Sequence, residues 1–197
     1  MNKILLIGEP MELLTSEDGA SLAEAENFRA SVSGSELNTA TGLSRLGCEA
    51  VYVTRLGDDP RAERIRAYIR RNGIDGSHII TDPLHQTGAM TKRKSTDGMH
   101  EIHYYRQCSA ASYLCEKDVE DIDLGGFRAM YFSGIFPTIS ASAAQAARHL
   151  VKRAREEDVT VIFDPNLRCQ LWTDDADTIA LLNEFAAAAD VFLPSLK

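Results

Sequence analysis

The sequence predicts an α/β fold with a mostly parallel sheet, because strand-like and helix-like segments alternate along most of its 197 residues. Three apolar runs, at 3–8, 129–133 and 159–163, have the composition of strands that are buried on both faces. Between such runs, apolar residues recur at helical spacing, as they do over 35–46 before a terminating glycine. This alternation implies right-handed crossovers between parallel strands.

Each element has its own local signals. The predicted strands lie at 3–8, 50–56, 129–133, 159–163 and 191–193. The predicted helices lie at 35–46, 60–72, 140–157 and 178–188. Pro60 suits a first helical position, and Ser140 or Ser142 suits a cap.

Two charged segments fall outside this alternation. Residues 9–30 contain the turn signal Asp18-Gly19, and the β-prone residues 87–106 have Asp97-Gly98 at their centre. We predict exposed hairpins there. They would form a small β lid over the carboxyl ends of the main strands, where ligands bind in open α/β sheets.

The length and the ordinary composition predict one globular domain over 1–197. A net charge of -8 argues against a nucleic acid or an anionic membrane as partner. The opening MNKILLIGEP is too short an apolar run for a signal peptide or a membrane span. The four cysteines have no metal-binding spacing, so we expect reduced thiols, no metal site of this kind, and a cytoplasmic location.

The segment 164–172, DPNLRCQLW, directly follows a predicted buried strand. Pro165 and Asn166 end that strand, so a carboxylate, an amide and a guanidinium are placed together at its carboxyl end. This position favours a ligand site. The alternative is a connecting loop in which Asp164 and Arg168 only satisfy each other.

The segment 33–40, SGSELNTA, runs from a loop into a predicted helix. Gly34 would let a ligand approach the backbone, and Asn38 can both donate and accept hydrogen bonds. The free N–H groups of a helix start suit an anionic or hydroxyl-rich ligand. The alternative is plain capping by Ser33 or Ser35, with a buried asparagine bonded to a neighbouring loop.

A third polar group precedes SAAS in the segment YYRQCSAAS. On a strand, Tyr104 and Arg106 share one face and Tyr105 takes the other. A phenol beside a guanidinium can hold a carboxylate with adjacent hydroxyls. The alternative is an aromatic hairpin face on which the arginine is merely solvated.

The chain has no GxxxxGK[ST] phosphate loop, no GxGxxG and no nucleophile elbow. Instead SGSELNTATGLSRLG, VTRLGDDP, YYRQCSAAS and DPNLRCQLW together resemble the ribokinase-like (pfkB-type) carbohydrate kinases, over essentially the whole chain. The similarity is strongest to members that act on the sugar acid 2-keto-3-deoxygluconate. It implies a three-layer α/β/α sandwich with a β lid that often forms a homodimer contact. It also implies transfer of the γ-phosphoryl group of ATP, with Mg²⁺, to a sugar hydroxyl.

The resemblance also implies roles for individual residues. Gly34 and Asn38 would contact the sugar, and Glu12 would line the same pocket. Tyr104 and Arg106 would bind the carboxylate end or adjacent hydroxyls from the lid.

Asn166 and Arg168 are assigned to the cofactor end of the site, and Arg168 would reach both the acid group and the transferred phosphoryl region. Ser33 stands where the family has a second glycine, and Ala62 lies near the place of another. The family's catalytic Gly-Ala-Gly-Asp segment and most of its adenine pocket are expected beyond Lys197. We therefore predict no catalytic residue within this chain, which would be the acceptor-binding part of the fold, truncated at its carboxyl end.

Two other functions stay open. A fructokinase-like or ribokinase-like specificity would need no pair of arginines aimed at a carboxylate. A non-catalytic sugar-acid binding fragment, dimerising through its lid, is the alternative from outside the enzyme class.

Overall fold

The computed structural model describes residues 2–18, 21–94, 101–169, 172 and 174–195. Its main sheet has six strands: β1 (Lys3–Ile7), β4 (Glu49–Gly57), β5 (Ile79–Asp82), β8 (Ala129–Ser133), β9 (Thr160–Asp164) and β10 (Val191–Phe192). Their order is β10-β9-β8-β1-β4-β5, and every pairing is parallel. Consequently, all of these strands end at the same edge of the sheet.

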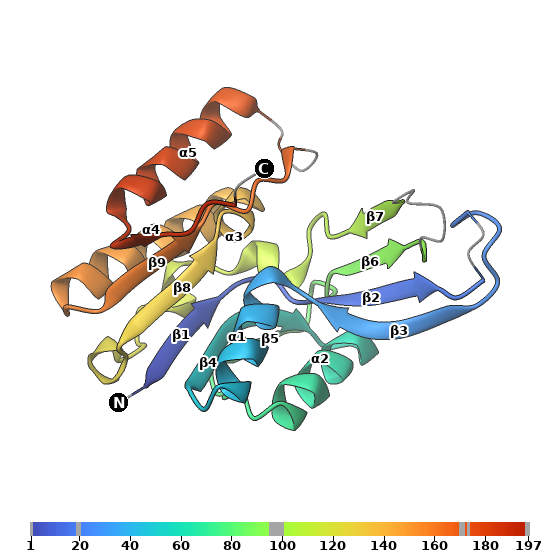
Figure 1. The fold of residues 1–197 in the computed structure, drawn as a ribbon, viewed down its shortest axis with the longest axis horizontal. Helices are drawn as coiled ribbons and strands as arrows, with labels where there is room; N and C mark the ends of the chain where they lie inside the picture. The colour runs from blue at the N-terminus through green and yellow to red at the C-terminus, as the bar shows by residue number, and fades with distance from the viewer. Residues whose placement is uncertain (1, 19–20, 95–100, 170–171, 173, 196–197) are drawn as a thin grey trace.

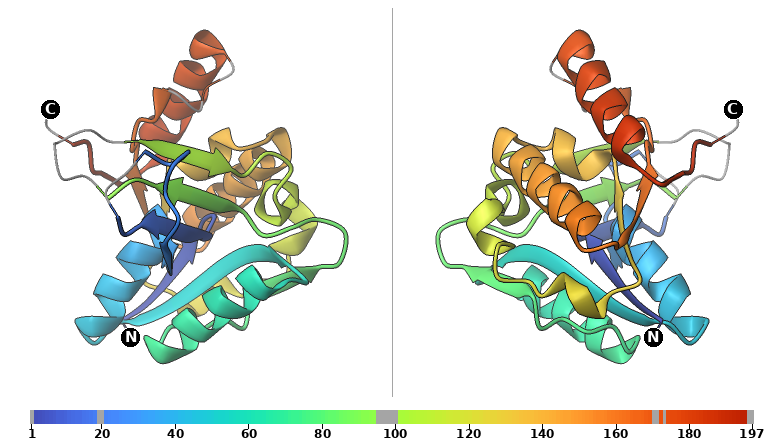
Figure 2. Two further views of the ribbon diagram at one scale, coloured as in Figure 1. Left: turned by 90° about the vertical axis from the view of Figure 1, so that its right-hand side faces the viewer. Right: turned by 90° about the vertical axis from the view of Figure 1, so that its left-hand side faces the viewer.

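Helices cover both faces of this sheet (Figures 1 and 2). The four long helices are α1 (Ser35–Arg45), α2 (Pro60–Arg71), α4 (Ala141–Glu156) and α5 (Asp175–Ala188). Within β1, Leu6 packs with the buried residues of α1 and α2, while Leu5 and Ile7 pack with those of α4 and α5. Because side chains alternate along a strand, one strand serves two cores. The predicted three-layer α/β/α sandwich is confirmed.

The remaining short elements join strands on the α4 face. They are η1 (Ala110–Tyr113), η2 (Glu116–Asp118), η3 (Leu124–Gly126) and the one-turn helix α3 (Ile135–Thr138). The sequence analysis did not predict them, because a single turn is too short to show a hydrophobic period.

A second, smaller sheet extends from the carboxyl edge of the main sheet (Figure 1). Its strands are β2 (Met11–Ser16), β3 (Phe28–Ser33), β6 (Ala89–Lys92) and β7 (Ile102–Tyr105), in the order β3-β2-β6-β7. The pairs β2–β3 and β6–β7 are antiparallel, and β2 pairs with β6 in parallel. We call this four-stranded sheet the lid. The predicted turn residues Gly19, Asp97 and Gly98 lie outside the described residues.

Most predicted boundaries agree with the structure to within a residue or two. Ser140 is the cap of α4, whereas α5 begins three residues before the predicted Thr178 because Asp174 caps it. The edge strand β5 was not predicted. Two apolar residues in four, Ile79 and Ile80, make too short a run to stand out.

Candidate functional site

The amino end of α1 lies at the carboxyl edge of the main sheet and requires a glycine. Gly34 is the N-cap residue, with a φ of 152° that side chains rarely adopt. A Cβ at this position would also lie 3.1 Å from the carbonyl oxygen of Glu9. Asn38, one turn further along α1, is exposed. Gly34 is itself buried, so its missing side chain lets the start of α1 pack closely against the backbone after β1, while Asn38 faces outward.

The capping alternative for this segment is wrong. No side chain caps α1, and Asn38 is not buried. The Ser35 hydroxyl instead accepts a hydrogen bond of 2.7 Å from Nδ2 of Asn166. The Glu36 carboxylate accepts from its own backbone N–H, so only the other N–H groups of the first turn are left for a negative or hydroxyl-rich ligand.

The loop after β9 is held against this helix end by inward-facing groups. The Asp164 carboxylate accepts from the Asn166 backbone over 2.9 Å and from the Tyr131 hydroxyl over 3.4 Å. Burial raises the pKa of Tyr131 to about 12, so its hydroxyl stays protonated. Arg168 is exposed and its Nη1 donates to the carbonyl of Leu167. No ion pair joins Asp164 and Arg168 in this described loop, so the mutual-satisfaction alternative is wrong.

The lid directs Tyr104 and Tyr105 to opposite sides. Tyr104 pairs with Met90 of β6, which in turn pairs with Leu13 of β2, and these three residues share one face. Arg106 follows β7 directly, and its guanidinium carbon lies 5.8 Å from the centre of the Tyr104 ring. The arginine side chain is only 11% exposed. The alternative of a merely solvated arginine is therefore wrong.

Arg106 has a partner that sequence reasoning missed. Its Nη2 forms an ion pair with Oε2 of Glu9, a residue that is 3% exposed. The other carboxylate oxygen of Glu9 accepts from the Ser109 hydroxyl over 2.5 Å. The available signal was a charged residue placed directly after the apolar run 3–8, at the carboxyl end of a central strand.

Glu12 lies on the other face of the lid. Its carboxylate is 2.9 Å from Nε of Arg64 and 3.5 Å from Nε of Arg61, both on α2. It shares a strand face with Tyr105 rather than Tyr104. We therefore correct the expectation that Glu12 lines the same pocket as Tyr104, and leave it out of the proposed site.

A second buried carboxylate, Glu36, lies beneath the amino end of α1. One of its oxygens accepts from the Ser133 hydroxyl over 2.5 Å and from the Ser133 backbone over 3.1 Å. A Cβ at residue 8 would lie 2.3 Å from its other oxygen, so Gly8 makes the room for it. Burial raises the pKa of Glu36 to about 7. This acid links α1 to the ends of β1 and β8.

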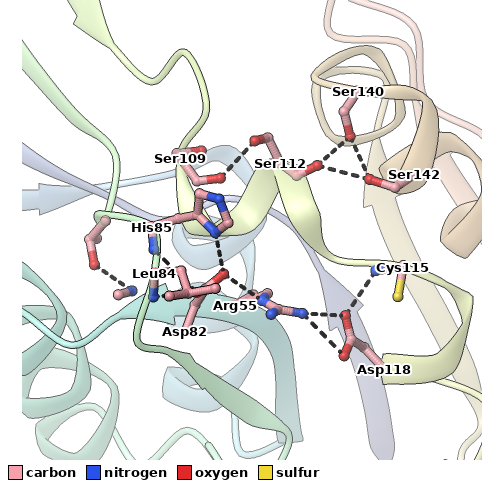
Figure 3. Close-up of polar contacts among 12 residues, drawn as sticks. Arg55, Asp82, Leu84, His85, Ser109, Ser112, Cys115, Asp118, Ser140 and Ser142 are labelled. Carbon is pink, nitrogen blue, oxygen red and sulfur yellow. Dashed lines mark hydrogen bonds and ion pairs between the residues drawn. The ribbon is translucent and has the colours of Figure 1, made fainter.

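A polar network braces the segments that lead into and out of the lid (Figure 3). Arg55 donates to the fully buried Asp82 over 2.9 Å and to Asp118 over 3.2 Å. Nδ1 of His85 lies 2.9 Å from Asp82, and the His85 ring stacks on Tyr113. The network joins β4, the segment between β5 and β6, and the η turns that follow β7.

In the part of the chain that the structure describes, no group of three or more His, Cys, Asp or Glu side chains is placed to hold a metal ion. No helix among the described residues is long and apolar enough to cross a membrane.

A lidded α/β/α sandwich, with polar groups gathered where the lid meets the strand ends, defines the ribokinase-like class of fold. The chain belongs to the pfkB family of carbohydrate kinases, because the model of that family matches residues 1–197. The family identification made from the four motifs is therefore confirmed.

Curated relatives fall into two groups by their names. The chain is 30% identical to 2-dehydro-3-deoxygluconokinase of Bacillus subtilis, over 96% of this chain and 59% of that protein. It is 32% identical to fructokinase-1 of Zea mays, over 78% of this chain and 47% of that protein. This chain thus spans about half the length of the curated relatives it matches.

Solved structures agree on the fold. The PfkB protein of Polaromonas sp. JS666 superposes with a TM-score of 0.94 at 36% identity, over 98% of this chain and 66% of that one. The 2-dehydro-3-deoxygluconokinase of Thermotoga maritima superposes with a TM-score of 0.90 at 26% identity, over 98% of this chain and 60% of that one.

Proposed function

We propose that this chain is the acceptor-binding part of a kinase that phosphorylates the sugar acid 2-keto-3-deoxygluconate, also named 2-dehydro-3-deoxygluconate. The observation that carries the proposal is Arg168, an exposed guanidinium without an acidic partner in the described chain. Arg168 follows Asn166, which bonds to the amino end of α1. An exposed cation in the loop that bonds to the amino end of α1 suits a carboxylate with neighbouring hydroxyls. The 2-dehydro-3-deoxygluconokinase relatives support the same substrate class.

ATP is the phosphoryl donor that this function requires. Arg168 fits an anionic phosphoryl group for the reason just given. Asn166 fits less well, because its side-chain amide already donates to Ser35 and leaves only its carbonyl oxygen. We assign no ligand for Mg²⁺, and we place the residues that bind most of the nucleotide outside this chain. Bound ATP would supply the phosphoryl group, while the residues of this chain bind and orient the acceptor.

The second candidate is a fructokinase, since plant fructokinases match the chain at similar identity. The two candidates differ in the charge of the acceptor, so direct binding separates them. Isothermal titration of this chain with 2-keto-3-deoxygluconate and with fructose is the test. We expect the acid to bind at least about tenfold more tightly, from one charge-assisted arginine contact. Equal affinities would favour the fructokinase, and a lack of binding by either sugar would refute both.

Arg168 should account for most of this preference. Arg168→Met removes the charge and keeps much of the length, so we expect affinity for the sugar acid to fall by about 10- to 100-fold. Affinity for fructose should change little. The matched control is Arg70→Met, which removes an exposed arginine from the last turn of α2. If Arg168→Met lowered the affinity for both sugars equally, the assignment of Arg168 to the carboxylate would be wrong.

We further propose that the lid mediates a homodimer. Phe28 and Tyr105 lie on the same face of this small sheet and expose 38% and 61% of their surface, and such groups favour association. Tyr105→Ser with Phe28→Ser should shift sedimentation at micromolar concentration from dimer toward monomer. If the unmodified protein already sedimented as a monomer at this concentration, the proposal would be contradicted.

A further inference from the structure

The Glu9 carboxylate joins the main sheet to the lid at two points. Glu9 lies between β1 and β2, where the chain crosses from one sheet into the other. From the lid side it receives the Arg106 ion pair and the Ser109 hydroxyl. A Cβ at residue 88, just before β6, would lie 2.8 Å from its Oε1, so Gly88 allows the close approach. The segments entering and leaving the β6–β7 hairpin therefore both meet this one side chain.

Burial makes the Glu9–Arg106 pair a strong constraint. The Glu9 side chain is 1% exposed and that of Arg106 is 11% exposed. A buried charge is costly unless it is paired, so neither group can turn away without leaving the other uncompensated. Arg106 also affects Glu36. Burial raises the pKa of Glu36, and the positive charge of Arg106 has a smaller effect in the opposite direction.

The Tyr52 hydroxyl lies in the same buried region as Glu9 and Glu36. Burial raises the pKa of Tyr52 well above its ordinary value, and the charges of Glu36 and Glu9 add to the effect. Both glutamates therefore lie near the Tyr52 hydroxyl, and Arg106 pairs directly with Glu9. Arg168 is different, since it is exposed and has no acid partner in the described chain.

We propose that Glu9 is a positioning residue for acceptor binding: it fixes the Arg106 guanidinium, and through it Tyr104, in the arrangement that receives the sugar. The inference rests on the proposed function. A guanidinium has five N–H donors in a rigid fork, so pairing with Glu9 leaves other donors pre-oriented for the acceptor. Tyr104 lies beside the fixed group, with its ring centre 5.8 Å from the guanidinium carbon. Fixing these groups before binding reduces the entropy lost on binding.

A double-mutant cycle tests the proposal on the chain as it is. The variants are Glu9→Gln, Arg106→Met and the pair together, each titrated with 2-keto-3-deoxygluconate and with fructose. Glu9→Gln should weaken binding of the acid by about tenfold, although Glu9 itself is not assigned a sugar contact. In the Arg106→Met background the same substitution should have no further effect. A matched control, Glu184→Gln, breaks the exposed pair between Glu184 of α5 and Arg148 of α4 and should leave both affinities unchanged.

A purely structural role for Glu9 gives a different pattern. It would lower the folded fraction but leave the affinity of the folded molecules unaltered, or it would weaken binding equally in both backgrounds. Either result would overturn the proposal. If Glu9→Gln does not fold, Ser109→Ala replaces it, because this variant keeps both charges but removes the hydrogen bond that orients the Glu9 carboxylate toward Arg106. Loss of affinity in Ser109→Ala that disappears in the Arg106→Met background supports positioning, and unchanged affinity refutes it.

Urea unfolding without sugar separates this inference from the proposed function. Each single variant should lower the unfolding midpoint, and the double variant should recover part of the loss because no buried charge is left unpaired. If the unmodified chain binds neither sugar while this recovery is seen, the proposed function fails although the pair is real. Additive midpoints would show that Glu9 does not hold Arg106, whatever the sugar result.

Discussion

Replacing Asp82 with alanine is expected to lower the free energy of unfolding by about 3 kcal/mol or more, the scale for breaking a buried charged network. Asp82 is fully buried and pairs with Arg55 and His85. It also accepts from the backbone N–H groups of Leu84 and His85. Burial opposes its ionisation, but the bonds from His85, Leu84 and Arg55 outweigh this and lower its pKa to about 2.

The neighbouring acid provides a graded comparison. Asp118→Ala removes a partly exposed partner of the same arginine, so we expect a loss of about 1–2 kcal/mol. Urea unfolding at pH 7, followed by circular dichroism, measures both variants. Equal losses would show that burial of Asp82 does not set the strength of the network. Because the network braces the segments around the lid, its loss should also weaken sugar binding.

Glu36→Gln is expected to remove a loss of about 3 kcal/mol in the free energy of unfolding that the unmodified protein suffers as the pH rises. The size follows from the difference between the Glu36 pKa of about 7 in the folded protein and its ordinary value of 4.5. Between these two values the unfolded chain has lost the Glu36 proton and the folded protein keeps it. The stability of the unmodified protein should therefore fall as pH rises from about 4.5 to about 7 and level off above. Glutamine cannot titrate, so the variant should gain stability relative to the unmodified protein across the same window.

Urea unfolding at several pH values between 4.5 and 8 measures this difference. Glutamine keeps an oxygen that can accept from Ser133, so the comparison isolates the ionisation. Glu120→Gln is the control, since it neutralises an exposed glutamate on the surface. A difference between Glu36→Gln and the unmodified protein that does not depend on pH would contradict the assignment of a raised pKa.

Arg106 and Arg168 come from similar sequence contexts but have different environments. Both were predicted from a polar group beside a strand end. Arg106 is buried against Glu9, whereas Arg168 is exposed. This difference is why we assign the carboxylate contact to Arg168 and a fixed, pre-oriented role to Arg106. Substituting Arg106 alone would also leave Glu9 uncompensated, so its effect on binding is interpretable only within the cycle.

The elements of this fold could be predicted from sequence because their signals are local. The apolar run of β1, the capped start of α2 at Asp59-Pro60 and the period of α1 each depend on neighbours along the chain. The antiparallel pairings within the lid were predicted for the same reason, since each joins adjacent strands. The parallel pairing of β2 with β6 joins strands more than 70 residues apart and had no local signal.

For the site, the sequence by itself determined the chemical types: a glycine at a helix start, a tyrosine and an arginine on one strand face, and a guanidinium after β9. Only the tertiary structure decided which charges meet. Glu9 and Arg106 are distant in sequence, as are Glu36 and Ser133, and their contacts depend on how the lid and the main sheet pack. Pairing and burial set the free energy of a charge far more than its residue type does. Residue types are readable from the chain, whereas pairing and burial exist only once it has folded.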